Sequence, residues 1–514
     1  CYVVVPETAK NNNGKKKVLA SVLAGLALVG GAVAGTPVDA YNSANPRTAD
    51  NGSINTDGSR INIAANAKPA NSVGVNSIVV GYQNTTDDND GTTALGANNQ
   101  AYGNSGLAVG NQNESSGGAS TAIGAGNRAA GAATVAIGNV SNANAQSAIA
   151  IGSYNNVEYT KGTWQTAPKN AGAYSTVVGN YSSATGRESA AMGVYSNSAG
   201  PGSFAAGYKE NALGQNSVAI GSENTSHVAD TITLGQSNNA KTMGGISIGK
   251  NNLTDSADGN RSDVERNREN SQIAIGRDNT ATNLDAIAIG RDTHATGSGA
   301  TALGARADAS GNNSIAIGQS GKTSDRVVAS GVNAIAIGMQ SQAAGEAGIA
   351  EGAGARAGGK YGVALGRTTK ANAEAATALG SAAEANIAEG VALGASSVTT
   401  TDKGVVGYNP SDPHERKYNP LTGNVKTATT AAVSIGNGST LTRQLTGLAA
   451  GTADTDAVNV AQLKNVGVAV TGNTGKSDFL TDGGKLNVIG TGRVSTVAAH
   501  DGAKDSKITV GFDD

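Results

Sequence analysis

Asn216-Ser217-Val218-Ala219-Ile220-Gly221 is the stretch that decides the fold. Its order of an apolar, a small and an apolar residue followed by glycine recurs from Ile78 onward, as in Asn313-Ser314-Ile315-Ala316-Ile317-Gly318. The closing glycines stand at 22 positions from Gly81 to Gly436. Of the 21 intervals between them, 16 are 14 residues long, as from Gly207 to Gly221. The longer intervals are Gly81 to Gly96, Gly152 to Gly179, Gly249 to Gly276, Gly318 to Gly338 and Gly394 to Gly436. Such a fixed period is the signature of a repeat architecture, and it predicts stacked 14-residue coils.

Each repeat also has an inner half-period. A second glycine often lies midway between two closing ones, as at Gly214 and Gly311, with alanine two positions before it, as at Ala212 and Ala309. Glycine permits a tight bend, so each coil is expected to hold two short strands that end in turns. Segments of four or five residues are too short for an amphipathic helix. The pattern therefore predicts an all-β coil.

The first strand of each repeat alternates apolar residues with alanine. A half-buried strand would carry a polar residue at the intervening position. Both strand faces are therefore expected to be covered, one inside the coil and the other against the axis of a homo-oligomer. The residues expected to form the core and the contact between chains are Ile149, Ala150, Ile151, Val218, Ala219, Ile220, Ile287, Ala288, Ile289, Ile315, Ala316 and Ile317. Glu351 replaces the usual Ile or Leu, which predicts local fraying or an unusual hydrogen-bonded pocket.

Composition supports a repeat with a core of small residues. The chain of 514 residues has 73 Gly, but only 3 Phe and 1 Trp. A globular core of comparable size normally uses many large aromatic side chains. The formal net charge is −2 and charged residues are 15% of the chain, which argues against a nucleic-acid partner.

The sequence predicts no catalytic, cofactor-binding or metal-binding residues. Cys1 is the sole cysteine, which excludes a disulfide framework and a thiolate metal cluster. The four histidines, at positions 227, 294, 414 and 500, lack a second ligand at zinc spacing and are expected in surface loops. The acidic residues form no catalytic pattern, so we expect that the protein is not an enzyme.

The first forty residues resemble part of an export signal. Lys15, Lys16 and Lys17 precede an apolar run over residues 18–34, which small residues follow. A transmembrane anchor is the alternative, because the run is about as long as the shortest spanning helices, about 17 residues. A second alternative is that Cys1 is a lipid-modified mature N-terminus. We expect a signal truncated at its start, because the chain begins without Met.

A short helix is predicted near the end of the chain. Asp454 or Thr455 can cap a helix that ends near Gly467. About a dozen residues are marginal for an isolated helix, so association around an axis would stabilise it. Its apolar positions include Ala457, Val460, Ala461 and Leu463.

These motifs resemble the trimeric autotransporter adhesins, the YadA-like family. The stretches at 216–221 and 313–318 are similar to the head repeat. Arg443-Gln444-Leu445-Thr446-Gly447-Leu448-Ala449-Ala450-Gly451 and Thr455-Asp456-Ala457-Val458-Asn459-Val460-Ala461-Gln462-Leu463 resemble the neck. The resemblance implies a left-handed parallel β-roll in a homotrimer, then a short helical neck or coiled coil and the start of a stalk.

The resemblance also implies a location and partners. The protein would stand on the outer membrane of a Gram-negative bacterium, held by a C-terminal anchor that is missing here. Host extracellular-matrix proteins of the collagen, fibronectin and laminin class are the implied ligands, together with cell–cell aggregation. The expected divisions are an export signal (1–40), a lead-in (41–66), the head (67–398), a connector (399–432), the last repeat and neck (433–466), and the start of a stalk with short β-structure (467–514).

Insertions in the repeat supply the candidate ligand contacts. The segment 153–178 carries the sole tryptophan and several tyrosines, and aromatic side chains anchor many interfaces. The alternative is that these rings pack over the roll. The insertion at 250–272 carries charges of both signs and is expected to be solvated. The candidate contact residues are Tyr154, Tyr159, Trp164 and Tyr174.

Two other functions fit a trimeric β-fibre. One is a tailspike-like enzyme that acts on polysaccharide, which would need a pair of carboxylates in a groove. The other is a passive spacer that projects another domain. Adhesion is the function that the sequence favours.

Overall fold

The computed structural model describes residues 53–57, 60–64, 76–87, 89–159, 166–256, 271–321, 325–407, 422–466, 487–500 and 506–512. The chain divides into two compact units, Cys1–Gln236 and Ser237–Asp514. The expected export signal (1–40) lies outside the described residues.

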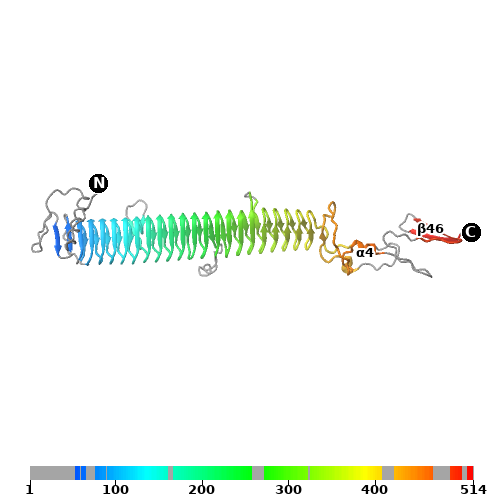
Figure 1. The fold of residues 1–514 in the computed structure, drawn as a ribbon, viewed down its shortest axis with the longest axis horizontal. Helices are drawn as coiled ribbons and strands as arrows, with labels where there is room; N and C mark the ends of the chain where they lie inside the picture. The colour runs from blue at the N-terminus through cyan, green and yellow to red at the C-terminus, as the bar shows by residue number, and fades with distance from the viewer. Residues whose placement is uncertain are drawn as a thin grey trace, which may run out of the picture. The chain divides into compact units, whose positions relative to one another are not determined.

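In the first unit, each repeat forms one coil with a long strand and a short strand. The long strands follow one another in a parallel sheet (Figure 1), and the described short strands form their own parallel sheets. The long strands are β3 (Ile78–Tyr82), β5 (Thr93–Ala97), β7 (Leu107–Asn111), β9 (Thr121–Ala125), β11 (Val135–Asn139), β13 (Ile149–Ser153), β16 (Thr176–Asn180), β18 (Ala190–Val194), β20 (Phe204–Tyr208), β22 (Val218–Ser222) and β24 (Ile232–Gln236). The short strands are β4 (Thr85–Thr86), β6 (Gln100–Ala101), β8 (Glu114–Ser115), β10 (Arg128–Ala129), β12 (Asn142–Ala143), β17 (Ser183–Ala184), β19 (Asn197–Ser198), β21 (Asn211–Ala212) and β23 (Thr225–Ser226).

Two antiparallel pairs add to this unit. The hairpin of β1 (Ser53–Asp57) and β2 (Arg60–Ala64) leads into the roll, because β2 pairs in parallel with β3. β14 (Val157–Tyr159) pairs with β15 (Thr166–Pro168) inside the aromatic insertion.

The second unit repeats the same coil. Its long strands are β26 (Ile246–Lys250), β28 (Ile273–Arg277), β30 (Ile287–Arg291), β32 (Thr301–Ala305), β34 (Ile315–Gln319), β36 (Ile335–Ile337), β38 (Ile349–Glu351), β40 (Val363–Leu365), β42 (Thr377–Leu379), β44 (Val391–Leu393) and β45 (Val433–Ser434). The short strands are β25 (Asn239–Ala240), β27 (Leu253–Asp255), β29 (Thr280–Thr282), β31 (His294–Ala295), β33 (Ala307–Ala309), β35 (Val327–Ala329), β37 (Gln342–Ala343), β39 (Arg356–Ala357), β41 (Lys370–Ala371) and β43 (Glu384–Ala385). The expected all-β parallel roll of 14-residue coils is thus confirmed.

Beyond the roll, the second unit contains short elements. β45 pairs directly with β44, with Val391 opposite Val433, so the last repeat continues the sheet after the connector. Helix α3 (Gly423–Lys426) lies in the connector and α4 (Val460–Lys464) in the neck. β46 (Val494–His500) and β47 (Ser506–Phe512) form an antiparallel hairpin.

The interior of each coil is narrow, and alanine fills most of it. In the first unit, Ala136 and Ala150 of the long strands and Ala129 and Ala143 of the short strands are fully buried in one cluster. In the second unit, a larger cluster runs from Ala274 to Ala392 and consists of alanines and Val327. Alanine loses no side-chain rotamer entropy on burial, so these cores form at low entropic cost.

A ladder of buried asparagines runs beside the alanines. The Asn113 side-chain amide donates to the carbonyl of Val109 at 3.0 Å and to that of Gly124 in the next coil at 2.8 Å. Its oxygen accepts from the backbone N–H of Asn127 at 3.1 Å and from the Asn127 amide at 2.9 Å. Asn127 repeats the arrangement one coil further on, with its amide donating to Ile123 and Gly138. A buried polar group is tolerated when it is fully hydrogen-bonded, so each asparagine ties adjacent coils together.

Glu210 occupies one rung of this ladder with a carboxyl group. Its side chain is fully buried, and Oε1 accepts from the Asn224 amide at 3.1 Å. Oε2, in contrast, is buried without a hydrogen-bond partner among the described residues. Burial raises the pKa of Glu210 to about 7, although the hydrogen bonds from Asn224 oppose the shift. The protonated acid fits this rung, because its O–H can take the donor role that the asparagine amide has elsewhere.

The Glu210 carboxyl should make the stability of the roll depend on pH. The pKa of Glu210 in the folded chain, about 7, lies above the ordinary value of 4.5. The contribution of the protonated carboxyl to the stability of the folded chain is therefore complete below about pH 4.5 and is lost as the pH rises through about 7. We expect the thermal unfolding temperature to fall between about pH 5 and about pH 8 by more in the natural chain than in Glu210→Gln. Equal falls in the two proteins would contradict this assignment.

Candidate functional site

The long strands carry an apolar outer surface on both units. In β13 the side chain of Ala150 is fully buried, whereas Ile149 is half-buried and Ile151 is 36% exposed. Strand alternation explains this pattern, because the alanine points into the coil and its two neighbours point out. Val218, Ala219 and Ile220 of β22 follow the same alternation.

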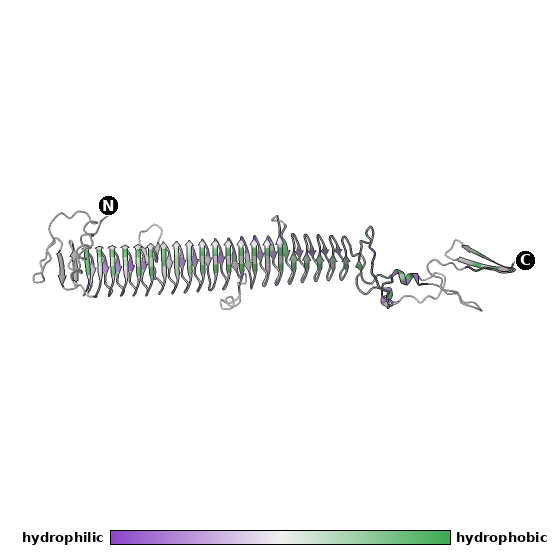
Figure 2. Cartoon of the chain, in the orientation of Figure 1, coloured by the Kyte–Doolittle hydropathy of each residue, from purple (hydrophilic) through white to green (hydrophobic). Residues whose placement is uncertain are grey.

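Parallel pairing lines these outward residues up in rows. In the first unit Ile220 lies opposite Leu234, and in the second unit Ile289 lies opposite Leu303, which lies opposite Ile317. We call the outward residues of the long strands the apolar strand face of each unit. Figure 2 shows hydrophobic residues recurring from coil to coil. Exposed members of the apolar strand face include Ile151, Met192, Ile232 and Leu234 in the first unit and Leu303, Leu379, Leu393 and Val433 in the second.

Glu351 interrupts the apolar strand face of the second unit. It keeps the register of its row, opposite Ile337 on one side and Leu365 on the other, and its side chain is exposed. The expectations of fraying or a bonded pocket at this position are therefore wrong. In the single chain the carboxylate stands on the outer surface.

A stack of tyrosines follows the turns of the first unit. Tyr154 stacks on Tyr181 with ring centroids 4.9 Å apart, and Tyr181 stacks on Tyr195 at 5.2 Å. Tyr208 then meets Tyr195 edge-on at 6.4 Å. Neighbouring strands lie about 4.8 Å apart, which matches the separation of stacked rings. We call these four residues the tyrosine ladder.

Two of the four predicted contact residues, Tyr154 and Tyr174, have described side chains, and they lie in different turns. Tyr154 belongs to the tyrosine ladder, in the turn after a long strand. Tyr174 lies in the turn before the next long strand, 47% exposed, with the Arg187 guanidinium 5.9 Å from its ring centre. Tyr159 lies at the end of β14, and neither its side chain nor Trp164 falls within the described residues. The sequence did carry a signal for the ladder, because three of its tyrosines stand two positions after a closing glycine.

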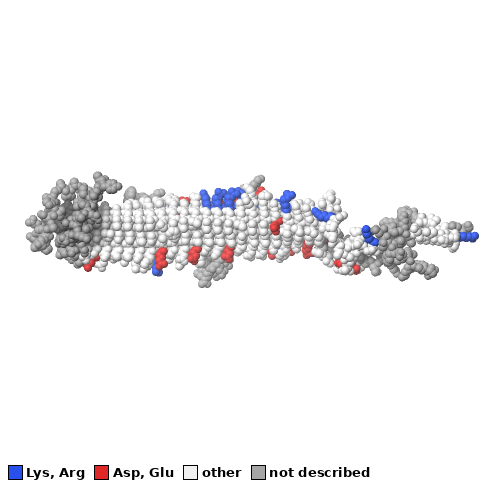
Figure 3. Space-filling model, viewed as in Figure 1, with Lys and Arg blue, Asp and Glu red and all other residues white. Residues whose placement is uncertain are grey.

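Charged side chains pair across neighbouring coils. Glu114 and Arg128 lie 3.1 Å apart in the first unit, and Lys370 and Glu384 lie 2.6 Å apart in the second. In Figure 3 the visible face of each unit carries few charged side chains. Within the residues that the structure describes, no group of three or more possible ligands could hold a metal ion.

The neck docks onto the last coil through Arg443. Its guanidinium donates to the Ser397 hydroxyl at 2.9 Å and to the main-chain carbonyls of Ala395 and Ile435. These acceptors belong to the segment after β44 and to the last repeat. Arg443 therefore covers the end of the roll with hydrogen bonds.

The neck helix starts later than the sequence suggested. Its N-cap is Asn459 rather than Asp454 or Thr455, and α4 extends only to Lys464. Asp456 instead accepts from the backbone N–H groups of Thr452 and Ala453, which lowers its pKa. The carboxylate therefore orders the turn before the helix.

Gln462 ties the helix to the preceding chain. Its side chain accepts from the backbone N–H groups of Asn459 and Gly451 and donates to the Gly451 carbonyl at 3.0 Å. The Asn459 side chain completes a capping box by accepting from the Gln462 backbone N–H at 2.8 Å.

The apolar residues of the neck face outward. Val460 and Leu463 are 68% and 66% exposed, and Ala457 and Ala461 are also exposed. A helix of this length is marginal when it is isolated in water. Among the described residues, no helix is long and apolar enough to cross a membrane.

Comparison with known proteins identifies two kinds of segment. The YadA head domain repeat matches residues 72–99, 88–113, 184–209, 211–226, 273–293, 295–320, 329–355 and 357–383. The coiled stalk of trimeric autotransporter adhesins matches residues 444–484.

Two curated relatives carry similar segments. Autotransporter adhesin BadA of Bartonella henselae is 37% identical over 119 residues, which are 21% of this chain and 4% of that protein. Trimeric autotransporter adhesin AtaA of Acinetobacter sp. (strain Tol 5) is 42% identical over 97 residues, 18% of this chain and 3% of that protein. The matches thus span a small part of each relative.

The capping box gives a test of the neck. Asn459→Ala should destabilise α4 by about 1 kcal/mol, because it leaves a helix N–H without a partner. We expect roughly fivefold faster hydrogen exchange at the amides of Leu463 and Val466, with the roll unchanged. Asn465→Ala is the control, since that side chain makes no hydrogen bond within the described residues. Equal exchange in the two variants would contradict the role of the cap.

Proposed function

We propose that this chain, which carries the head repeats and the stalk segment of trimeric autotransporter adhesins, forms a homotrimer that acts as a surface adhesin. The observation that carries the proposal is the apolar strand face. A single chain leaves rows of Ile, Val and Leu half-buried or exposed along the long strands of each unit. Soluble monomers rarely expose contiguous apolar patches beyond a few hundred Å².

Association of identical chains is the simplest way to cover this face. Cyclic symmetry places the same face of every chain on one axis, so each coil covers its counterpart. The exposed apolar residues of α4 then gain partners at the same axis. The number three rests on the likeness to the trimeric family, because the structure of one chain does not give the number of chains in the oligomer.

The proposed location is suggested by the relatives, and the proposed ligands by the resemblance to the YadA-like family. Two proteins named autotransporter adhesins are similar to part of this chain, which supports an exported, non-enzymatic protein, held by a C-terminal anchor in the outer membrane of a Gram-negative bacterium. We propose attachment to host matrix proteins of the collagen, fibronectin and laminin class, and aggregation of cells. Three identical sites on each fibre raise avidity above the affinity of one site.

The proposed divisions of the chain are those expected from the sequence. The head would occupy 67–398 and the connector 399–432, with the last repeat and neck at 433–466 and the start of the stalk at 467–514. The hairpin of β46 and β47 supports short β-structure in that last segment. Residues 1–66 would be the signal and the lead-in.

The oligomer can be tested by a substitution on the apolar strand face. Ile220→Asp places a charge at a half-buried outward position and should weaken association at least about tenfold, because an unpaired carboxylate would be desolvated at the interface. Light scattering and native mass spectrometry across a dilution series would measure the change. Thr225→Asp, on the short strand of the same repeat, is the control and should associate normally. A folded, stable monomer of the natural chain at micromolar concentration would refute the trimer.

Adhesion can be tested with purified full-length chain. We expect saturable binding to at least one of immobilised collagen, fibronectin and laminin, and aggregation of beads coated with the protein. Trp164→Ala should weaken the binding and leave the thermal unfolding unchanged, because an aromatic side chain in an insertion can contribute to an interface without supporting the roll. The absence of both binding and aggregation would assign the chain to the passive spacers, and release of sugars from polysaccharide would assign it to the enzymes.

A further inference from the structure

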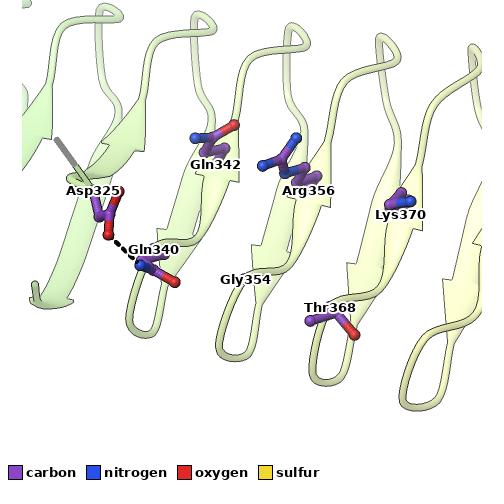
Figure 4. Close-up of a pocket in the computed structure, with 7 residues that line it drawn as sticks. All are labelled: Asp325, Gln340, Gln342, Gly354, Arg356, Thr368 and Lys370. Atoms are coloured by element: carbon purple, nitrogen blue, oxygen red, sulfur yellow. Dashed lines mark hydrogen bonds between the residues drawn. The ribbon is translucent and has the colours of Figure 1, made fainter.

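A polar groove lies on the outer surface of the second unit. Its volume is about 460 Å³, and its two sides come from different parts of the coil. One side is a row of short-strand residues, and the other is a row of turn residues that follow the long strands (Figure 4). The residues lining it are Gln342, Arg356 and Lys370 from the strands and Gln340, Gly354 and Thr368 from the turns, with Asp325 at one end.

A single glycine opens the groove. Gln340, Gly354 and Thr368 occupy the same turn position in three successive repeats, and all three have a positive φ, of 61°, 70° and 54°. Gln340 and Thr368 carry side chains at this position, whereas Gly354 leaves the space empty. A Cβ built on Gly354 would make ordinary contact with Thr368 at 3.4 Å, so the position has room for a side chain. The hollow is therefore a property of this residue rather than of the backbone.

The strand side of the groove places two cations next to each other. Parallel pairing puts Arg356 opposite Lys370, and Lys370 opposite Glu384. Lys370 pairs with Glu384 at 2.6 Å, and the residue opposite Arg356 on its other side is the neutral Gln342. Among the residues that the structure describes, the Arg356 guanidinium has no ion pair or hydrogen bond. Like charges opposite each other are unfavourable, and a bound anion would relieve that cost.

The remaining lining is suited to a ligand that is rich in hydroxyl groups. Gln340 donates to the Asp325 carboxylate at 2.7 Å, which leaves its side-chain oxygen facing the groove region as an acceptor. Gln342 adds an amide and Thr368 a hydroxyl. None of the seven lining residues has an apolar or aromatic side chain, so the groove offers donors and acceptors rather than a hydrophobic anchor. Guanidinium groups bind carboxylate and sulfate groups through two parallel hydrogen bonds.

We propose that this groove binds an acidic glycan, with Arg356 holding a carboxylate or sulfate group and Lys370 lying beside it as a second cation. The neighbouring amides and the Thr368 hydroxyl bind sugar hydroxyl groups. The inference goes beyond attachment to matrix proteins, because it assigns a ligand class to a different surface. Arg356 points outward from the short strand, whereas Ala357 beside it points into the core. The strand side of the groove therefore lies outside the apolar strand face.

Binding of soluble polysaccharides to the full chain would test the proposal. Heparin supplies sulfate groups, polygalacturonate supplies carboxylates, and dextran is the neutral control. We expect at least one acidic polysaccharide to bind, with an affinity that falls as salt is added, and dextran not to bind. Binding by either heparin or polygalacturonate supports the proposal and shows which anionic group is preferred.

Two variants separate the groove from general charge. Arg356→Gln and Gly354→Gln should each weaken binding at least fivefold, the first by removing the cation and the second by filling the hollow without a change of charge. Gly354→Gln is expected to fold, because glutamine already occupies the equivalent turn position at Gln340. Arg128→Gln removes one positive charge from the first unit and is the matched control, which should bind like the natural chain.

Several results would overturn the inference. It would be overturned if neither acidic polysaccharide bound, if Arg128→Gln lost as much binding as Arg356→Gln, or if Gly354→Gln bound like the natural chain. Binding of polyglutamate, an acidic polymer without sugars, in the absence of binding to either polysaccharide would also overturn it. A change of oligomeric state in Arg356→Gln would assign that residue to the contact between chains and would also overturn it. Binding to matrix proteins, measured on the same variants, should not change. The glycan-binding proposal and the adhesin proposal can therefore fail independently of each other.

Discussion

The contact between closing glycines of successive coils is the constraint on which the roll depends. Gly221 has a φ of +128°, and a Cβ on it would overlap the carbonyl oxygen of Gly235 in the next coil. Gly276 and Gly290 repeat this relation in the second unit. Any side chain would push the coils apart and break the parallel strand hydrogen bonds, for which the spacing is about 4.8 Å. The glycine spacing in the sequence therefore records the length of chain in one coil, and the asparagine ladder supports the same stacking from inside the turn, as Asn113 does through its bond to Gly124.

The narrow coil has a consequence for the outer surface. Its interior holds mainly Ala, Ser, Thr and Asn, with Val at a few positions such as Val79 and Val177, so the Ile and Leu residues of the long strands face outward. Ile149 and Ile151 thus flank a buried Ala150. This arrangement reverses the usual one, in which large apolar side chains form the core and small or polar residues cover it. It also agrees with a composition of 3 Phe and 1 Trp, because a core of small residues needs few large aromatic side chains.

The sequence predicted the coil, its two strands and the line of alanines, because a strict period reports backbone geometry directly. It did not show which strand face points into the coil. An alternation of Ile and Ala puts one residue type on each face, and the width of the coil determines which of the two types fits inside. The helix start was misplaced because several capping residues lie close together. Asp454 and Thr455 looked suitable, but Asp456 orders the preceding turn and Asn459 caps the helix. The tyrosine ladder was missed because the insertion before Gly179 hides that Tyr154 and Tyr181 hold the same turn position.

In a repeat of this kind, chemistry specific to one place arises where one coil departs from the others. Glu210 replaces an asparagine in the buried ladder and brings in a group that titrates near neutral pH, because burial raises its pKa to about 7. Gly354 replaces a side chain in a turn row and opens a hollow beside Arg356, because the backbone keeps the same left-handed conformation without it. Neither change disturbs the spacing that the closing glycines impose. The regular coils thus hold the backbone fixed, and a single substitution on that backbone alters one position without altering its neighbours.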